Sequence, residues 1–194
     1  MVYSVTQGTG FEAIRKLNIA GGNLLPSDLT DATNLQDVAI GPAGNILSVA
    51  SNGVITEFDP DGQLLFQFGG REDGSTRAGL FMQPSAIEVD DAGRLFIADS
   101  EQGTIQLLEP TAFTRVVHEG ITLFSDGFYV ESEKHWQEVL KLNSSFGLAH
   151  HAIGQAFFKQ QHYEEALERF KLAENREGIQ MHFGKFAIYG CRRT

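Results

Sequence analysis

The sequence has a single cysteine, Cys191, among its 194 residues. One cysteine cannot form an internal disulfide or supply a cysteine-based zinc site, so neither cross-link can stabilise the fold. No uninterrupted apolar run reaches the ~18 residues that a membrane-spanning helix needs. The first residues lack a basic stretch followed by an apolar core, and they therefore predict no secretory signal.

Positively charged residues are also few: the sequence has 15 Lys and Arg and 25 Asp and Glu, which gives a net charge of −10. Phosphate binding needs a positive face, so this balance argues against a nucleic-acid partner, RNA included. Residues 1–113 hold 5 Lys and Arg against 15 Asp and Glu, whereas residues 114–194 hold 10 of each. This shift predicts two domains, with a boundary near Pro110–Thr114, where a proline suits the first turn of a helix.

The first part of the chain repeats itself. The stretch DVAIGPAGNILSVASNGVITEF from Asp37 aligns with AIEVDDAGRLFIADSEQGTIQLL from Ala86, and Gly44 then falls on Gly93. The second copy has one extra residue after this point, so Gly53 falls on Gly103. Each copy predicts three short strands, because apolar and polar residues alternate between turns that end in glycine. The turns 41–44, 59–62 and 90–93 share one chemistry, in which glycine takes the left-handed position that closes the hairpin. A partial copy opens the chain.

The second full copy, from Phe81-Met82-Gln83-Pro84 to Ala98-Asp99, resembles the NHL repeat, and Phe68-Gly69 upstream fits the same family. A repeat of this length with about four strands is typical of β-propellers. The resemblance implies that residues 1–113 are all-β, a partial NHL-like propeller of about two and a third blades. The chain departs from the family at Gln102 and Thr104.

This blade count falls short of the roughly four to eight blades that a closed propeller needs. Three interpretations stay open: a fragment of a longer propeller, several copies that assemble a ring, or a partial stack capped by the helices. The fragment is favoured because the chain begins midway through a blade. An open blade face would leave apolar strands exposed, so we expect marginal stability or self-association through that face.

The second part of the chain shows helical spacing of small and large side chains. Gly154 would allow close helix contact, while Tyr163 and Phe170 would fill the space between helices. Tyr129 and Tyr163 lie 34 residues apart, the period of the tetratricopeptide (TPR) repeat, which this part resembles. The resemblance implies an α-helical TPR solenoid over residues 114–194, with two hairpins and a capping helix over 178–193.

TPR hairpins bind extended peptides along the inner face of their first helices. The resemblance therefore implies a peptide groove formed by five residues: Leu148, His151, Gln155, Phe158 and Lys159. Clamping of a terminal carboxylate would need several cations, and only Lys159 fits that pattern. The alternative for Phe158 is that its ring packs on the neighbouring hairpin.

Catalytic or metal chemistry is weakly indicated. Residues 1–113 contain no histidine, which excludes a zinc-lyase site among them. Glu88, Asp90 and Asp99 could hold calcium, but we interpret Asp90 as the start of a turn and Asp99 as a backbone cap at a strand end. His150 and His151 point about 100° apart on a helix and do not converge on one metal. We predict no catalytic residue, no metal and no cofactor.

These observations predict a non-catalytic interaction or scaffold module that binds a protein or peptide through the TPR groove or the propeller surface. The alternative is a fragment of a propeller hydrolase or lyase of the lactonase kind, with its active site mostly in absent blades. The domain order and the closing Lys185-Phe186-Ala187 resemble bacterial NHL/TPR membrane proteins. That resemblance implies an extracytoplasmic location near a carbohydrate-uptake system, with the membrane reached only through segments outside this chain.

Overall fold

The computed structural model describes residues 2–5, 14–25, 34–72, 77–174 and 189–192. The chain divides into two compact units. The first contains Met1–Glu109 together with Gly190–Thr194, and the second contains Pro110–Tyr189. Each unit is described by itself below.

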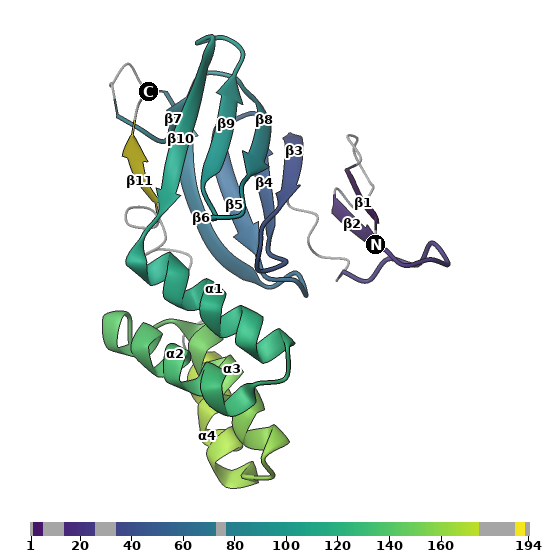
Figure 1. The fold of residues 1–194 in the computed structure, drawn as a ribbon, viewed down its shortest axis with the longest axis vertical. Coiled ribbons are helices and arrows are strands. Elements are labelled where there is room, and N and C mark those ends of the chain that lie inside the picture. The colour runs from purple at the N-terminus through teal and green to yellow at the C-terminus, as the bar shows by residue number, and fades with distance from the viewer. Residues whose placement is uncertain (1, 6–13, 26–33, 73–76, 175–188, 193–194) are drawn as a thin grey trace. The chain divides into compact units, whose positions relative to one another are not determined.

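The described strands of the first unit form three sheets (Figure 1). A hairpin pairs β1 (Val2–Val5) with β2 (Ile14–Leu17). The five-stranded sheet follows chain order: β3 (Leu35–Ile40), β4 (Ile46–Ala50), β5 (Val54–Phe58), β6 (Leu64–Arg71) and β7 (Leu80–Phe81). The four-stranded sheet has the order β11-β10-β9-β8, formed by Tyr189–Arg192, Thr104–Pro110, Leu95–Asp99 and Pro84–Val89.

Strand β4 is buried on both faces. On one face Ile46 clusters with Ile14, Leu25 and Leu35, so the β1–β2 hairpin covers that side. Successive side chains of a strand point to opposite faces, so Leu47 lies on the other face, where β3 and β4 pack against β8. The core of this unit therefore lies in layers on either side of the five-stranded sheet.

One carboxylate joins two sheets of this unit. Asp37 Oδ1 accepts the backbone N–H of its neighbour Val38 at 2.9 Å, and Asp37 Oδ2 accepts the N–H of Ile87 in β8 at 3.0 Å. Both β3 and β8 lie at sheet edges, where backbone N–H groups lack a strand partner. Asp37 satisfies one such group on each strand and fixes the position of one sheet against the other.

The predicted fold class, NHL-like β-propeller blades followed by an α-helical TPR solenoid, is wrong. The described chain is a mixed α/β fold, with sheets of two, five and four strands and four helices. A propeller needs roughly four or more similar sheets around a channel. The helices also do not simply follow the β part, because β11 comes after them and returns to pair beside β10. A solenoid needs about three stacked units, and the described helices provide two hairpins.

The predicted capping helix over 178–193 differs from the structure where it is described. Tyr189–Arg192 form strand β11 in the four-stranded sheet. Residues 178–188 and 193 lie outside the described residues.

Four turns of five residues share one hydrogen-bond pattern: Asn18–Gly22, Gly41–Asn45, Asp59–Gln63 and Asp90–Arg94. In each, the first N–H donates to the fifth carbonyl, and the fourth N–H donates to the first carbonyl. The fourth residue is always glycine, with φ between 74° and 87°, the left-handed region that glycine adopts most easily. The structure confirms the shared chemistry that the sequence predicts for the last three, and it adds the first.

The first side chain of these turns also takes part. Asn18, Asp59 and Asp90 each accept the N–H groups of the third and fifth residues on one oxygen. At the remaining turn, a Cβ on Gly41 would collide with the side chain of Asn45, so glycine is required there. Because Asn18 accepts the same two N–H groups as Asp59 and Asp90, either asparagine or aspartate can serve as the acceptor at the first position of this type of turn.

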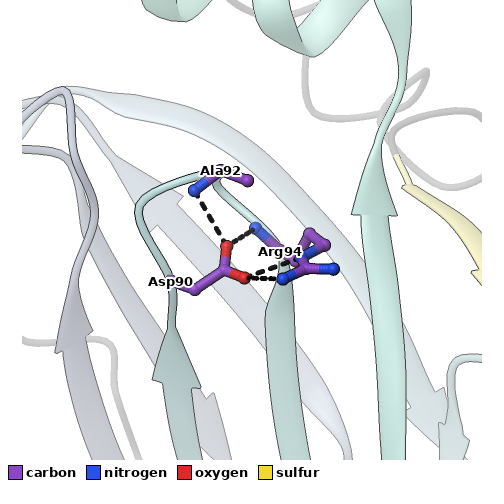
Figure 2. A network of polar contacts seen from close by, with 3 residues as sticks. All are labelled: Asp90, Ala92 and Arg94. Carbon is purple, nitrogen blue, oxygen red and sulfur yellow. Dashed lines mark hydrogen bonds and ion pairs between the residues drawn. The ribbon is translucent and has the colours of Figure 1, made fainter.

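The turns at Asp59 and Asp90 differ in electrostatics. Arg94 Nε and Nη2 both lie 2.6 Å from Asp90 Oδ2, while the N–H groups of Ala92 and Arg94 donate to Oδ1 (Figure 2). The guanidinium lowers the pKa of Asp90. Gln63 stands at the corresponding position beside Asp59, where burial raises the pKa of the carboxyl to about 6.

We expect Asp59→Asn to stabilise the first unit above pH 6 and to leave its stability unchanged below pH 4. The raised pKa means that the folded state binds the Asp59 proton more tightly than the unfolded state does, with an ordinary value of 3.8. Stability from this group is therefore complete below the unfolded pKa and is lost as the pH rises through about 6. The shift corresponds to about 2–3 kcal/mol, which asparagine removes.

Urea unfolding of Asp59→Asn and of the unsubstituted protein between pH 3 and pH 8 measures this difference. Asp90→Asn is the matched control with the opposite sign. Because the pKa of Asp90 is lowered, its contribution is present above the unfolded pKa and disappears in acid. Parallel pH profiles for Asp59→Asn and the unsubstituted protein would contradict the prediction.

The described residues of the second unit form four helices, α1 (Ala112–Ser125), α2 (Tyr129–Leu142), α3 (Gly147–Lys159) and α4 (Tyr163–Glu174). Each helix packs against the next one along the chain. Thr111 caps α1, since its Oγ1 accepts the N–H of Thr114 at 3.3 Å. Within the described part of the chain, no helix combines the length and apolar character needed to span a membrane.

Two glycines allow the helices to approach closely. A Cβ on Gly120 would lie 2.9 Å from the ring of Trp136, and a Cβ on Gly154 would lie 2.7 Å from the ring of Phe170. Real Cβ atoms do not approach other atoms so closely, so each glycine makes room for one aromatic ring. The predicted role of Gly154 in close helix contact is confirmed.

Candidate functional site

Each residue of the predicted groove lies three or four positions from another member, so at about 100° per residue all five fall on one face of α3. Phe158 and Lys159 are adjacent in the sequence and lie at the two edges of that face. Phe158 is 54% exposed and Lys159 is exposed, whereas the other three are half-buried. The five residues of the predicted groove are, in chain order, Leu148, His151, Gln155, Phe158 and Lys159. The face is therefore most open at the C-terminal end of the helix.

The middle of this face is occupied by contacts within the unit. Gln155 Nε2 lies 2.8 Å from His151 Nε2, within hydrogen-bond distance. The centroid of the His151 ring lies 5.3 Å from that of the Phe170 ring in α4. Gly154 has no side chain, and this leaves room for the Phe170 ring beside α3. His151 and Gln155 therefore have local partners, and they support the shape of the surface.

The open end continues onto α4. The rings of Phe158 and Tyr163 meet edge to face with centroids 5.5 Å apart, and Tyr163 is 59% exposed. Leu167 lies one helical turn further along α4 and is 55% exposed. We call Phe158, Tyr163 and Leu167 the apolar ridge. The expectation that Tyr163 fills the space between helices is wrong, because its side chain is mostly in solvent.

The turn between α3 and α4 creates this ridge. The N–H of Gln161 donates to the Phe158 carbonyl at 3.0 Å, and the N–H of His162 donates to the Phe157 carbonyl at 2.9 Å. This is the pattern of a helix end whose next residue is left-handed, and Gln161 has φ 66°. The tight reversal places Phe158 beside Tyr163, so their side chains meet at the hairpin tip.

Lys159 borders the ridge. Its Nζ lies 6.0 Å from the centroid of the Tyr129 ring at the start of α2, the outer limit of a cation–π contact. The ammonium thus stays beside an aromatic ring and is still exposed. A cation of this kind can meet a carboxylate on a bound partner.

The acidic residues considered for calcium hold backbone groups instead. Asp99 is 1% exposed, and its two oxygens accept four backbone N–H groups, those of Met82, Gln83, Glu101 and Gln102. The interpretations of Asp99 as a backbone cap and of Asp90 as a turn residue are both confirmed. Glu88 Oε1 accepts the N–H of Val89 at 3.2 Å. Among the described residues, no three His, Cys, Asp or Glu side chains lie together in a group that could hold a metal ion.

The two adjacent histidines point to different neighbours, as their helical positions predict. His150 is 6% exposed, with Nε2 3.2 Å from the Ser144 carbonyl and Nδ1 3.4 Å from Arg169 Nη1. His151 contacts Gln155 and Phe170 instead.

Sequence reasoning missed one buried polar pair in the first unit. Glu57 is fully buried, and Asn45 Nδ2 donates to its Oε1 at 2.5 Å. Glu57 follows Ile55 at a spacing of two on the inward face of β5, and a charge at such an apolar position is the signal that could have revealed the pair.

No protein-family model matches the sequence, and no curated protein matches it either.

Proposed function

We propose that this protein is a non-catalytic interaction module that binds a protein or peptide partner on the apolar ridge. The observation that supports this function is the group of three large apolar side chains, each more than half exposed, at the tip of the α3–α4 hairpin. Contiguous exposed apolar surface marks interaction sites, and aromatic side chains dominate binding energy at such sites.

The surroundings of the ridge fit a partner that is apolar with charged ends. Lys159 is exposed on one side, and Glu164 and Glu168 are exposed on α4. Both signs of charge are therefore available at the edge, where they set orientation more than affinity.

The hydrolase or lyase alternative, with its active site mostly in absent blades, stays a prediction, although the described sheets and helices do not form the propeller fold from which it was inferred. The extracytoplasmic, membrane-associated location and the carbohydrate-uptake system stay predictions.

Selection of a phage-displayed random-peptide library against the full chain tests the proposal. We expect the selected peptides to be rich in apolar residues, and we expect Phe158→Ala to weaken the best of them by about tenfold or more in a calorimetric titration, the loss typical of an aromatic hot spot.

Leu142→Ala is the matched control, because Leu142 is 65% exposed on the same unit. It ends α2, whereas the start of α2 lies beside Lys159 near the ridge. Leu142→Ala should change the dissociation constant by less than twofold. Failure to select any peptide, or equal losses in both variants, would refute the proposed site.

A further inference from the structure

The second copy of the internal repeat does not continue into a fourth strand as the first copy does. In the first copy, β5 runs through the Asp59–Gln63 turn into β6, which pairs with β5 in antiparallel register. The repeat aligns β10 with β5, and continuing the alignment puts Glu109-Pro110 on Asp59-Pro60. Here, however, the chain enters helix α1 at Ala112 instead of returning as a strand.

The residue at the glycine position of the turn differs between the two copies. The turn after β5 has Gly62 in the left-handed region, with φ 87°, and the same alignment puts Ala112 at that position. A side chain makes this backbone conformation unfavourable, so the tight turn is disfavoured in the second copy. Thr111 caps a helix instead, because its Oγ1 accepts the N–H of Thr114. The chain therefore leaves the sheet as a helix where the first copy turns back.

A segment from much later in the chain takes the position beside β10. Strand β11 (Tyr189–Arg192) pairs with β10, in the place that β6 has beside β5. β11 has four residues, whereas β6 has eight and β10 has seven. Helices α1 to α4 all lie between β10 and β11 in the chain. β11 is therefore a short and remote substitute for a hairpin strand.

β11 is held by fewer contacts of its backbone than β6. Among the described strands, β11 lies at a sheet edge and pairs with β10 alone, whereas β6 pairs with both β5 and β7. Pairing with β9 holds β10 in place independently, in a register that runs from Thr104 opposite Asp99 to Leu108 opposite Leu95. A strand joined through a long connection also regains more conformational freedom on leaving than a hairpin strand does. β11 can thus detach while the pairing of β10 with β9 stays intact.

Detachment of β11 exposes the backbone N–H and C=O groups along one side of β10. Such a row is a template for strand addition, in which main-chain hydrogen bonds supply affinity and alternate side chains supply selectivity. Ile105 in β10 is 61% exposed, unlike its repeat equivalent Ile55, which is fully buried. Leu107, two residues further on the same face, is half-buried. A strand added beside β10 can therefore pack apolar side chains at alternate positions against these two residues.

We propose that this side of β10 is a strand-addition site for an extended segment of a partner protein, and that β11 occupies the site in the isolated chain. β11 shows directly that an extended backbone fits there. The partner segment has apolar residues at alternate positions, the pattern that Tyr189 and Cys191 give to β11. β10 belongs to the first unit, so this site is separate from the apolar ridge and does not depend on it.

Fluorescence anisotropy with a labelled peptide tests the site. The probe is the segment KFAIYGCRRT of this chain, residues 185–194, kept in reducing buffer. The acceptor is the full chain with Gly190→Pro and Cys191→Pro together, which removes one N–H group from each side of β11. We expect this double-proline variant to bind the peptide at least about tenfold more tightly than the unsubstituted protein, because the resident strand no longer competes.

The matched control combines Gly190→Ala with Cys191→Ser. It keeps both N–H groups, so it should bind the peptide as weakly as the unsubstituted protein does. A peptide that contains both prolines should bind to neither protein. Hydrogen exchange then locates the bound peptide, which should slow the exchange of β10 amides in the double-proline variant and leave the amides of α3 and α4 unchanged.

Hydrogen exchange of the unsubstituted protein gives a second test that needs no variant. The amides of Tyr189–Arg192 should exchange at least about tenfold faster than those of β9, since β11 detaches while β9 and β10 stay paired. Equal exchange in β11 and β9, equal peptide affinities of the double-proline variant and the unsubstituted protein, or a bound peptide that leaves β10 unprotected would each overturn the proposal. A dimer of the unsubstituted protein that the two prolines abolish would overturn the partner as occupant and identify a second copy instead.

Discussion

Replacing Asp99 by alanine is expected to lower the free energy of unfolding of the first unit by about 2–4 kcal/mol. Its carboxylate accepts four backbone N–H groups at 2.7 to 3.2 Å while remaining 1% exposed. Alanine would leave these donors without their acceptor, and each buried donor that water cannot reach costs about 1–3 kcal/mol. Met82 and Gln83 are exposed, so water can accept hydrogen bonds from some of the released N–H groups. The expected loss of unfolding free energy is therefore smaller than the cost of four fully buried, unsatisfied donors.

Hydrogen exchange of backbone amides in β8, β9 and β10 measures this loss in the first unit itself. The protein has one tryptophan, Trp136 in α2, so fluorescence reports on the second unit instead. Asp91→Ala is the control, because Asp91 is exposed in the Asp90–Arg94 turn that precedes β9, and its loss should change stability by less than about 0.5 kcal/mol. Equal exchange rates in Asp99→Ala and Asp91→Ala would show that the carboxylate contributes little.

Trp136→Ala is expected to destabilise the second unit by about 3–5 kcal/mol. The side chain is 1% exposed and fills the space that Gly120 leaves open, so its removal creates a large cavity between α1 and α2. Trp136→Phe should cost less, because the ring is partly retained. In addition, Trp136 Nε1 is buried and has no hydrogen-bond partner in the described structure, so phenylalanine also removes an unsatisfied donor.

Urea unfolding followed by helical circular dichroism measures both variants, since neither retains the tryptophan. Gly120→Ala should also destabilise, by about 1–3 kcal/mol, because its Cβ would meet the indole ring. Combining Gly120→Ala with Trp136→Phe should cost less than the sum of the two, since the smaller ring makes room for the methyl group. Strictly additive losses would show that this packing contact is not the cause.

Local chemistry was readable from the sequence. The turns at 59–62 and 90–93 and the divergence of His150 and His151 depend on residues a few positions apart. The Asp99 cap is local in its bonds from Glu101 and Gln102, whereas its other two donors lie 16 and 17 residues earlier in the chain. Local hydrogen bonds of this kind form wherever the same short sequence occurs, so their residue types predict them directly.

The layering of the sheets and the exposure of the ridge were decided by the tertiary structure. Nothing near Tyr189 in the sequence indicates that β11 pairs beside β10, from which it is separated in the chain by the described helices α1 to α4. Equivalent residues such as Ile55 and Ile105 have the same local pattern, yet one is buried and the other is 61% exposed. Tyr163 likewise fits a core position by its spacing but lies in solvent. The physical reason is that burial and edge pairing depend on which distant segment arrives, and periodicity within a segment contains no information about that segment's partner.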